Sequence, residues 1–400
     1  MKPDPTGQKE SSDKTIDWLA LGLVKIDGEL WEEAIEALDK VLNREPGNAG
    51  AWFDKGFALD ELGRDQEALE CYDRFIAIEP NDAMAWYNRG IALRRLGRYE
   101  EAIKSYDRAF AIDPPNANAW NSKGFALERL GQFEEALESY DRAIAVEPEH
   151  AKGWNNRASA LIDLGRCEEA IESYDHAIAI DPQDADAWND RGVALDELGR
   201  HLEAIESFDR GIAIAPDDPR AWYNRGASLY DFGRYEEALE SYDRSIAIAS
   251  NDADAWHNRG LTLTKLGRDE EARESLDRAV AVSPDDAKTW QNRGSALADL
   301  GRHEEALASY DRALAIETDY ARAWLNRGVT LDDLGRYEES LESFDRSISH
   351  DPQNALAWYN RSLSLDDLDQ HEEASKSYDR AIALAPDDVE AWKNRDVTLD

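Results

Sequence analysis

Tryptophans divide this chain into segments of equal length. Twelve of them are each 34 residues from the next, and Trp31 is the only tryptophan outside the series: Trp18, Trp52, Trp86, Trp120, Trp154, Trp188, Trp222, Trp256, Trp290, Trp324, Trp358 and Trp392. A unit of this size cannot bury its own apolar face, because only a neighbouring copy can cover it. The sequence therefore predicts one array of stacked repeats, although a length of 400 residues would alone suggest roughly two to four globular domains.

Residues 185–218 show how each unit is built. The apolar or small residues of the first half follow helical spacings of three and four: Trp188, Gly192, Leu195 and Leu198. A second run of this kind contains Ala204, Ile205, Phe208, Ile212 and Ile214. Gly199 should end the first helix, because a residue without a Cβ easily adopts left-handed backbone, and Pro216 should end the second. Glu203 lies near the positive end of the second helix, and Asp218 is expected to cap the next repeat. No stretch alternates with the period of two that a strand requires.

The residues of another unit carry a family pattern. Its order is Trp120, Gly124, Leu127, Ala136, Tyr140, Ala143 and Pro148. This order resembles the tetratricopeptide repeat family, and the resemblance covers residues 15–400. It implies an all-α fold, a right-handed superhelical solenoid of antiparallel helix pairs. A tryptophan at the centre of such packing predicts that Trp188→Ala costs roughly 3–5 kcal/mol if the ring is fully buried.

The repeats also define the expected organisation of the chain. Residues 1–14 are polar and are expected to be a disordered tail. Eleven repeats fill residues 15–388, and residues 389–400 form half a repeat, interpreted as a capping helix because Asp396 replaces a packing glycine. The alternative is that the sequence was cut from a longer array.

Some repeats depart from the pattern. Ser250 and Thr318 replace the boundary proline, a change that capping and packing should tolerate. In the eleventh repeat Asp369 replaces the turn glycine and Ser362 the small packing residue, which predicts looser packing near the C-terminus.

Composition limits the partners. The sequence has 46 Lys and Arg against 85 Asp and Glu, a net charge of −39, which disfavours nucleic acid and anionic membrane surfaces. No apolar run is long enough to span a bilayer, and residues 1–14 do not resemble a secretory signal. Cys71 and Cys167 lie in different repeats at different places, so we expect no disulfide and a cytoplasmic location.

The sequence shows no convergent catalytic or cofactor site. The histidines are scattered over different repeats: His150, His176, His201, His257, His303, His350 and His371. We therefore expect structural or solvated histidines, no metal, no cofactor and no enzymatic activity. Each Leu-Gly-Arg is interpreted as a helix end, since no phosphate-binding loop is present.

A basic residue follows each of eleven tryptophans by three positions, where the resemblance leads us to expect leucine. These residues are Lys55, Arg89, Lys123, Arg157, Arg191, Arg225, Arg259, Arg293, Arg327, Arg361 and Arg395. We predict that each stem lies on apolar surface while its head meets an acid of the same or adjacent repeat, within about 4 Å, as a charge ladder. The recurring Asp-Arg pair, such as Asp209 and Arg210, is interpreted as a solvated face.

The resemblance implies that first helices line a concave groove, with ligand contacts two residues before and one, five, eight and nine residues after the tryptophan. In repeats two to four these places hold a predicted peptide-binding patch: Phe53, Phe57, Tyr87, Ile91, Arg94, Arg95, Asn121, Phe125 and Arg129. The aromatic rings and arginines are typical anchors of peptide recognition, with carboxylates as partners of the arginines. The alternative is that Phe57, Ile91 and Phe125 pack between first helices.

The later repeats hold a predicted acidic groove. Its acids are Asp186, Asp196, Glu197, Asp231, Asp254, Asp299, Asp332, Asp333, Asp366 and Asp367, and its bases are Arg220, Lys265, Lys288 and Arg322. A basic segment should be attracted there, less strongly as salt rises.

These observations predict a non-enzymatic scaffold that binds peptide segments of partner proteins. We do not expect a carboxylate-clamp cochaperone, because only Lys393 matches the first place of that clamp and no asparagine matches the next. Two alternatives stay open: a substrate-recruiting or regulatory region of a larger enzyme, and a self-associating scaffold.

Overall fold

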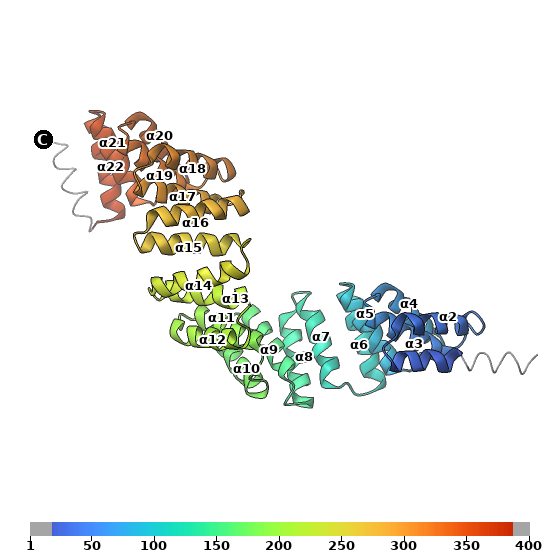
Figure 1. Ribbon diagram of the computed structural model, residues 1–400. Coiled ribbons are helices and arrows are strands. Elements are labelled where there is room, and N and C mark those ends of the chain that lie inside the picture. The colour runs from blue at the N-terminus through green and yellow to red at the C-terminus, as the bar shows by residue number, and fades with distance from the viewer. Residues whose placement is uncertain (1–17, 387–400) are drawn as a thin grey trace, which may run out of the picture. The chain divides into compact units, whose positions relative to one another are not determined.

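The computed structural model describes residues 18–386, and all regular structure within them is α-helical (Figure 1). Residues 18–27 are helical, and twenty-one further helices follow. In the first half they are α2 (Trp31–Leu42), α3 (Ala49–Glu61), α4 (Asp65–Ile78), α5 (Ala83–Arg95), α6 (Tyr99–Ile112), α7 (Ala117–Glu128), α8 (Phe133–Val146), α9 (Ala151–Asp163), α10 (Cys167–Ile180) and α11 (Ala185–Glu197). In the second half they are α12 (His201–Ile214), α13 (Pro219–Asp231), α14 (Tyr235–Ile248), α15 (Ala253–Lys265), α16 (Asp269–Val282), α17 (Ala287–Asp299), α18 (His303–Ile316), α19 (Ala321–Asp333), α20 (Tyr337–His350), α21 (Ala355–Asp367) and α22 (His371–Leu384).

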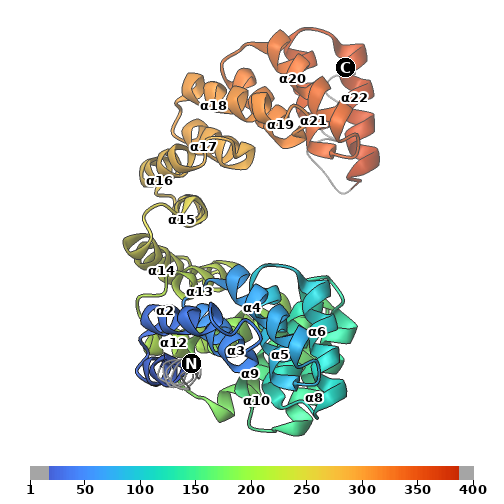
Figure 2. The same ribbon diagram turned by 90° about the vertical axis from the view of Figure 1, so that its right-hand side faces the viewer.

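The described residues form two compact units, and the boundary between them in the sequence lies between Leu198 and Gly199. Within each unit, odd-numbered helices are the first helices of the repeats and even-numbered helices are the second. Inside a unit, first helices pack on the second helices of their own repeats, for example α9 on α10 and α13 on α14, and the pairs follow one another in chain order, as α15 to α22 show in Figures 1 and 2. First helices also contact the first helix of the next repeat, for example α3 with α5 and α13 with α15. The predicted all-α array of helix pairs is confirmed, whereas its right-handed superhelical form stays a prediction.

Capping and glycine turns set the helix boundaries. The Asp218 carboxylate accepts from the backbone N–H of Arg220 at 2.9 Å, which confirms the predicted cap of α13. Gly199 has a φ of +71°, in the left-handed region that favours glycine after a helix. Asp369 keeps the same turn with a φ of +57°. Ser362 is fully buried and donates to the Tyr359 carbonyl oxygen at 2.5 Å, so the predicted looser packing is not visible there.

A buried aromatic ring of the second helix fills the centre of most repeats. Tyr140, Tyr310 and Phe344 are each at most 1% exposed. A Cβ at Gly124 would lie 2.6 Å from the ring of Tyr140, closer than the ring can accept without moving. The buried ring therefore explains why the residue four positions after the tryptophan is small.

The repeat tryptophan is only half-buried, so the condition of full burial, on which the predicted effect of Trp188→Ala depends, is not met. The indole N–H of Trp188 instead donates to the carbonyl oxygen of Pro182, six residues earlier, at 3.2 Å. Trp256 and Trp324 make the same bond to the carbonyl oxygens of Ser250 and Thr318, at 3.0 and 2.9 Å. A backbone carbonyl does not depend on the side chain, which explains why the boundary proline is dispensable.

Two predicted segments fall outside the described residues. They are the tail of residues 1–14 and the half-repeat of residues 389–400, which contains Trp392, Lys393, Arg395 and Asp396.

Candidate functional site

The predicted charge ladder is confirmed in residues 18–386. The guanidinium of Arg259 donates to Asp243 on the preceding second helix at 2.6 Å and to Ser275 on its own second helix at 2.6 Å. The cation-to-carboxylate contact recurs at 2.6–2.8 Å in the other described repeats: Lys55 with Asp39, Arg89 with Asp73, Lys123 with Asp107, Arg157 with Asp141, Arg191 with Asp175, Arg225 with Asp209, Arg293 with Asp277, Arg327 with Asp311 and Arg361 with Asp345.

Each ladder contact joins helices of neighbouring repeats. The Arg259 side chain is 19% exposed and the Asp243 side chain 49% exposed, so the ion pair is partly shielded from water. The interpretation of the Asp-Arg pair as a merely solvated face is wrong for its aspartate, because Asp209 and its equivalents bind the ladder cations. These cations are therefore structural and are not available to a partner.

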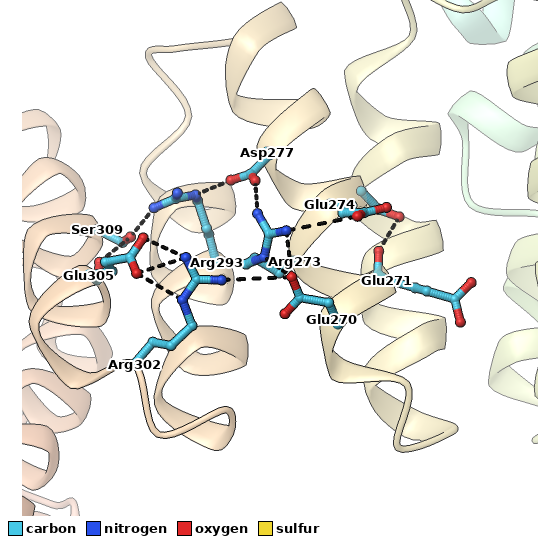
Figure 3. A network of polar contacts seen from close by, with 10 residues as sticks. Glu270, Glu271, Arg273, Glu274, Asp277, Arg293, Arg302, Glu305 and Ser309 are labelled. Carbon is cyan, nitrogen blue, oxygen red and sulfur yellow. Dashed lines mark hydrogen bonds and ion pairs between the residues drawn. The ribbon is translucent and has the colours of Figure 1, made fainter.

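The ladder widens into a network over α16, α17 and α18 (Figure 3). Arg273 stands where other second helices bury Leu239 or Leu307, and it donates to Glu270 at 2.7 Å and to Asp277. Asp277 also accepts from Arg293 at 2.6 Å, so two guanidinium groups share one carboxylate. This network links consecutive helices of the array.

The predicted aromatic patch in repeats two to four is largely filled by its own contacts. Phe53 contacts Phe75 with ring centroids 5.3 Å apart, and Phe57 contacts Trp31 at 5.9 Å. Tyr87 lies 5.9 Å from Tyr106, against the same cluster as Ile91, and it also lines an open hollow of about 180 Å³ together with Met84 and Phe110. The contacts of Phe57 and Ile91 favour the alternative interpretation, in which these side chains pack within the array.

Two of the three patch arginines are also engaged within the protein. Arg95 donates to the Asp60 carboxylate at 2.9 Å, and the guanidinium of Arg94 lies 5.2 Å from the ring centroid of Phe125. Burial raises the pKa of Asp60 to about 6, although Arg95 opposes the shift. The two remaining polar residues of the patch are Asn121, which accepts from Asn156 Nδ2 at 2.9 Å, and Arg129, which is exposed. Partner binding through Arg94, Arg95 and Arg129 stays a prediction.

The structure divides the predicted acidic groove into two classes. The acids eight residues after the tryptophan are half-buried: Asp196, Asp332 and Asp366. Asp332 accepts from the Ser364 hydroxyl at 2.6 Å and Asp366 from the Tyr378 hydroxyl at 3.1 Å. The acids nine residues after, together with the two acids that precede the tryptophan, are exposed: Glu197, Asp231, Asp299, Asp333, Asp367, Asp186 and Asp254. Only this second class presents its carboxylates openly to solvent.

Three hollows lie over the first helices α13, α15, α17 and α19. The Asp231 hollow, of about 210 Å³, is lined by Ala227, Tyr230, Asp231, Tyr242, Asn258 and Leu261. The cationic hollow, of about 290 Å³, is lined by Tyr230, Leu261, Thr264, Lys265, Lys288, Gln291, Asn292, Ser295, Ala296, Tyr320 and Arg322. The Asp299 hollow, of about 190 Å³, is lined by Ser295, Ala298, Asp299, Tyr310, Asn326, Val329, Thr330 and Asp333.

The hollows form one series because neighbours share residues. Tyr230 and Leu261 line both the Asp231 hollow and the cationic hollow, and Ser295 lines both the cationic hollow and the Asp299 hollow. Sequence reasoning named the three basic residues but did not find that they surround one hollow. The available signal was the small residues at the recognition places, such as Ser295 and Ala298, which leave space between first helices.

The described histidines support a structural interpretation at two positions. His257 Nδ1 lies 2.6 Å from the Thr289 hydroxyl, and burial lowers the pKa of this histidine. The His150 ring accepts from the backbone N–H of Gly153 at 2.9 Å and so caps α9. Among residues 18–386, no group of three potential ligands is placed to hold a metal ion. None of the described helices combines the length and apolarity that crossing a bilayer requires.

Tetratricopeptide repeat family models match the chain from residue 19 to residue 389. One model alone matches residues 19–83, 123–185, 160–219, 190–253, 292–355 and 325–389. Further models with the same description match residues 83–116, 251–319 and 105–138. The chain belongs to the tetratricopeptide repeat family. Tetratricopeptide repeat arrays generally mediate protein–protein interactions.

Solved structures resemble this tetratricopeptide repeat protein at low identity. A chain in the crystal structure of the APC/C hetero-tetramer Cut9–Hcn1 is 14% identical to this protein. The match covers 96% of this chain and 96% of that chain with a TM-score of 0.50, which supports the fold. A tetratricopeptide repeat protein from Parabacteroides merdae ATCC 43184 is 20% identical over 62% of this chain and 98% of its own, with a TM-score of 0.47. YrrB, described as having an unusual peptide-binding site, is 24% identical over 48% of this chain and 99% of its own, with a TM-score of 0.42. None of the curated proteins compared with the chain matches it significantly.

Proposed function

We propose that this tetratricopeptide repeat protein is a non-enzymatic scaffold that binds peptide segments of partner proteins along its first helices. The series of hollows over α13, α15, α17 and α19 carries the proposal. These hollows lie at the places that packing within the repeat leaves variable, and concave sites with a few fixed polar groups are typical of ligand recognition. The series of adjoining hollows favours the second unit as the binding region over repeats two to four, where a hollow of about 180 Å³ beside Tyr87 shares no lining residue with this series.

The polar clusters elsewhere support a binding role without catalysis. The ladder cations and the network around Arg273 are bound to carboxylates that link helices, so they serve the array itself. We also propose a cytoplasmic location, supported by Cys71 and Cys167, which are both free thiols in different repeats.

A peptide-display selection tests the binding role. Random peptides of about twelve residues are selected on the whole chain, and the bound site is mapped by amide hydrogen exchange. We expect protection of amides in α13–α19, and we expect Ser295→Phe to abolish binding because a ring would fill two adjoining hollows. Glu240→Phe is the matched control, since it adds the same ring at an exposed position of second helix α14. Selected peptides that bind Ser295→Phe as well as the original chain would exclude this face.

A further inference from the structure

We infer that the cationic hollow binds carboxylate side chains at the centre of an extended partner segment whose two ends are basic. The inference rests on the proposed function and adds the charge order of the partner.

The first step is the charge of the cationic hollow. Lys265, Lys288 and Arg322 line it, and none of its lining residues is acidic. Among the described residues, no carboxylate lies within ion-pair distance of these three side chains. Such a site is unexpected in a chain with 85 acids and 46 bases. Lysine and arginine heads only donate hydrogen bonds, so the complementary ligand group is an anionic acceptor such as a carboxylate.

The second step is that hydrogen bonds within the protein hold the lining of the cationic hollow in place. Gln291 is fully buried, and its amide donates to the Ser295 hydroxyl at 2.9 Å. Asn326 donates to the same hydroxyl at 3.1 Å. These bonds join α17 to α19 and fix the boundary between the cationic hollow and the Asp299 hollow. A site held by its own hydrogen bonds loses little freedom when a ligand binds.

The third step is the charge on either side. Asp231 lines the preceding hollow, while Asp299 and Asp333 line the following one, and neither flanking hollow is lined by a lysine or arginine. Along the series the charge is therefore negative, positive and negative. A segment whose charges run positive, negative and positive places an opposite charge in each of the three hollows. A segment whose charges run negative, positive and negative places a like charge in each.

The length of the segment follows from the helices. Four first helices packed at about 8–10 Å spacing extend over about 30 Å. An extended chain advances about 3.3 Å per residue, so about nine to eleven residues are needed. This length admits a central acidic cluster with a basic residue at each end.

Two peptides of identical composition test the charge order. Each has eleven residues, blocked termini and a palindromic sequence, so the direction of binding does not matter. One has two lysines at each end and two pairs of glutamates towards the centre, with serine elsewhere; the other exchanges lysine and glutamate. Both are electrically neutral, so general attraction to the acidic chain is the same. We expect the peptide with central glutamates to bind the full chain at least about tenfold more tightly in calorimetry.

Charge-removing variants locate the effect. The triple variant Lys265→Gln, Lys288→Gln and Arg322→Gln should lower the affinity for the central-glutamate peptide to that of the reversed peptide. Lys152→Gln is the matched control, because Lys152 occupies in α9 the same repeat place as Lys288 and Arg322, outside the hollows. It should leave the affinity unchanged within about twofold. Circular dichroism of each variant checks that the fold is retained.

The outcomes separate the inference from the proposed function. Equal affinity for both peptides overturns the inference, and so does an unchanged affinity in the triple variant. In either case the proposed function survives if binding of the display-selected peptides is still lost in Ser295→Phe. Failure of every peptide to bind this face overturns both. Self-association that is lost in the triple variant would identify a second copy as the occupant and would also overturn the inference.

Discussion

Five residues after the tryptophan, repeats two to four carry Phe57, Ile91 and Phe125, whereas repeats eight and nine carry Leu261 and Ser295. The larger side chains of the first unit contact neighbouring helices: Phe57 contacts Trp31 on second helix α2, and Phe125 contacts Arg94 on first helix α5. In the second unit the smaller or more flexible side chains line open hollows. At this repeat place Phe57 and Phe125 thus contribute to packing in the first unit, whereas Ser295 lines an open hollow in the second, because a serine fills less of the space beside a first helix than a phenylalanine does.

The charged residues differ in the same way. Arg95 in the first unit is bound to Asp60, whereas Lys265, Lys288 and Arg322 in the second unit surround a hollow without acids. An arginine at a recognition place is therefore not by itself a ligand contact, since its availability depends on which acid the neighbouring helix presents.

The largest expected effect comes from exchanging the large and small side chains at the place five residues after the tryptophan. Phe125→Ser should destabilise the repeats around α7 by about 2–3 kcal/mol, because it removes a half-buried ring and the aromatic partner of Arg94. Ser295→Phe enters an existing hollow but removes the hydroxyl that accepts from Gln291 and Asn326, so it should cost less than Phe125→Ser, about 1 kcal/mol. Hydrogen exchange of amides in each repeat measures both, and equal losses in the two variants would contradict the comparison.

A smaller effect is expected from breaking the Arg95 pair. Arg95→Ala leaves the Asp60 carboxylate, 8% exposed, without its closest cation, so the second and third repeats should lose about 1–3 kcal/mol. Arg129→Ala, at the same repeat place in α7's C-terminal cap, is the control and should lose little. Denaturation monitored by hydrogen exchange measures the loss of stability in each variant. An equal loss of stability in both variants would show that the contact of Arg95 with Asp60 contributes nothing specific.

The pH dependence of the first unit should follow Asp60. Its pKa is raised from 3.8 to about 6 in the folded chain, so the folded state binds the proton more tightly than the unfolded state. This contribution is fully present below about pH 3.8 and is lost as pH rises through about 6, by about 1–2 kcal/mol. Asp60→Asn should remove this part of the decline between pH 4 and 7 in α3–α6. A decline of unchanged size in the variant would assign it to other groups.

The smallest effect concerns the ladder, which both units share. Arg259→Lys should keep the contact with Asp243 but lose the second bond to Ser275, at a cost of about 0.5–1 kcal/mol. Lys123 is a natural example of this arrangement, with its ammonium 2.6 Å from Asp107. Arg278→Lys, at an exposed position of α16, provides the control. Denaturation midpoints measure the difference, and identical midpoints for the two variants would show that the second bond contributes nothing.

The sequence by itself determined the repeat, the helix pairs, the caps and the existence of the charge ladder, although the aspartates that pair with the ladder cations were interpreted as a solvated face. These features depend on residues at fixed separations, such as the 16 residues between Asp243 and Arg259, which the period brings together in the same way from Lys55 in the second repeat to Arg361 in the eleventh. Tertiary structure decided which variable residues are free. Phe57 and Lys288 both occupy recognition places, yet one contacts Trp31 and the other lines an open hollow. That outcome depends on the volume and charge of residues one or more repeats away, which no single repeat encodes.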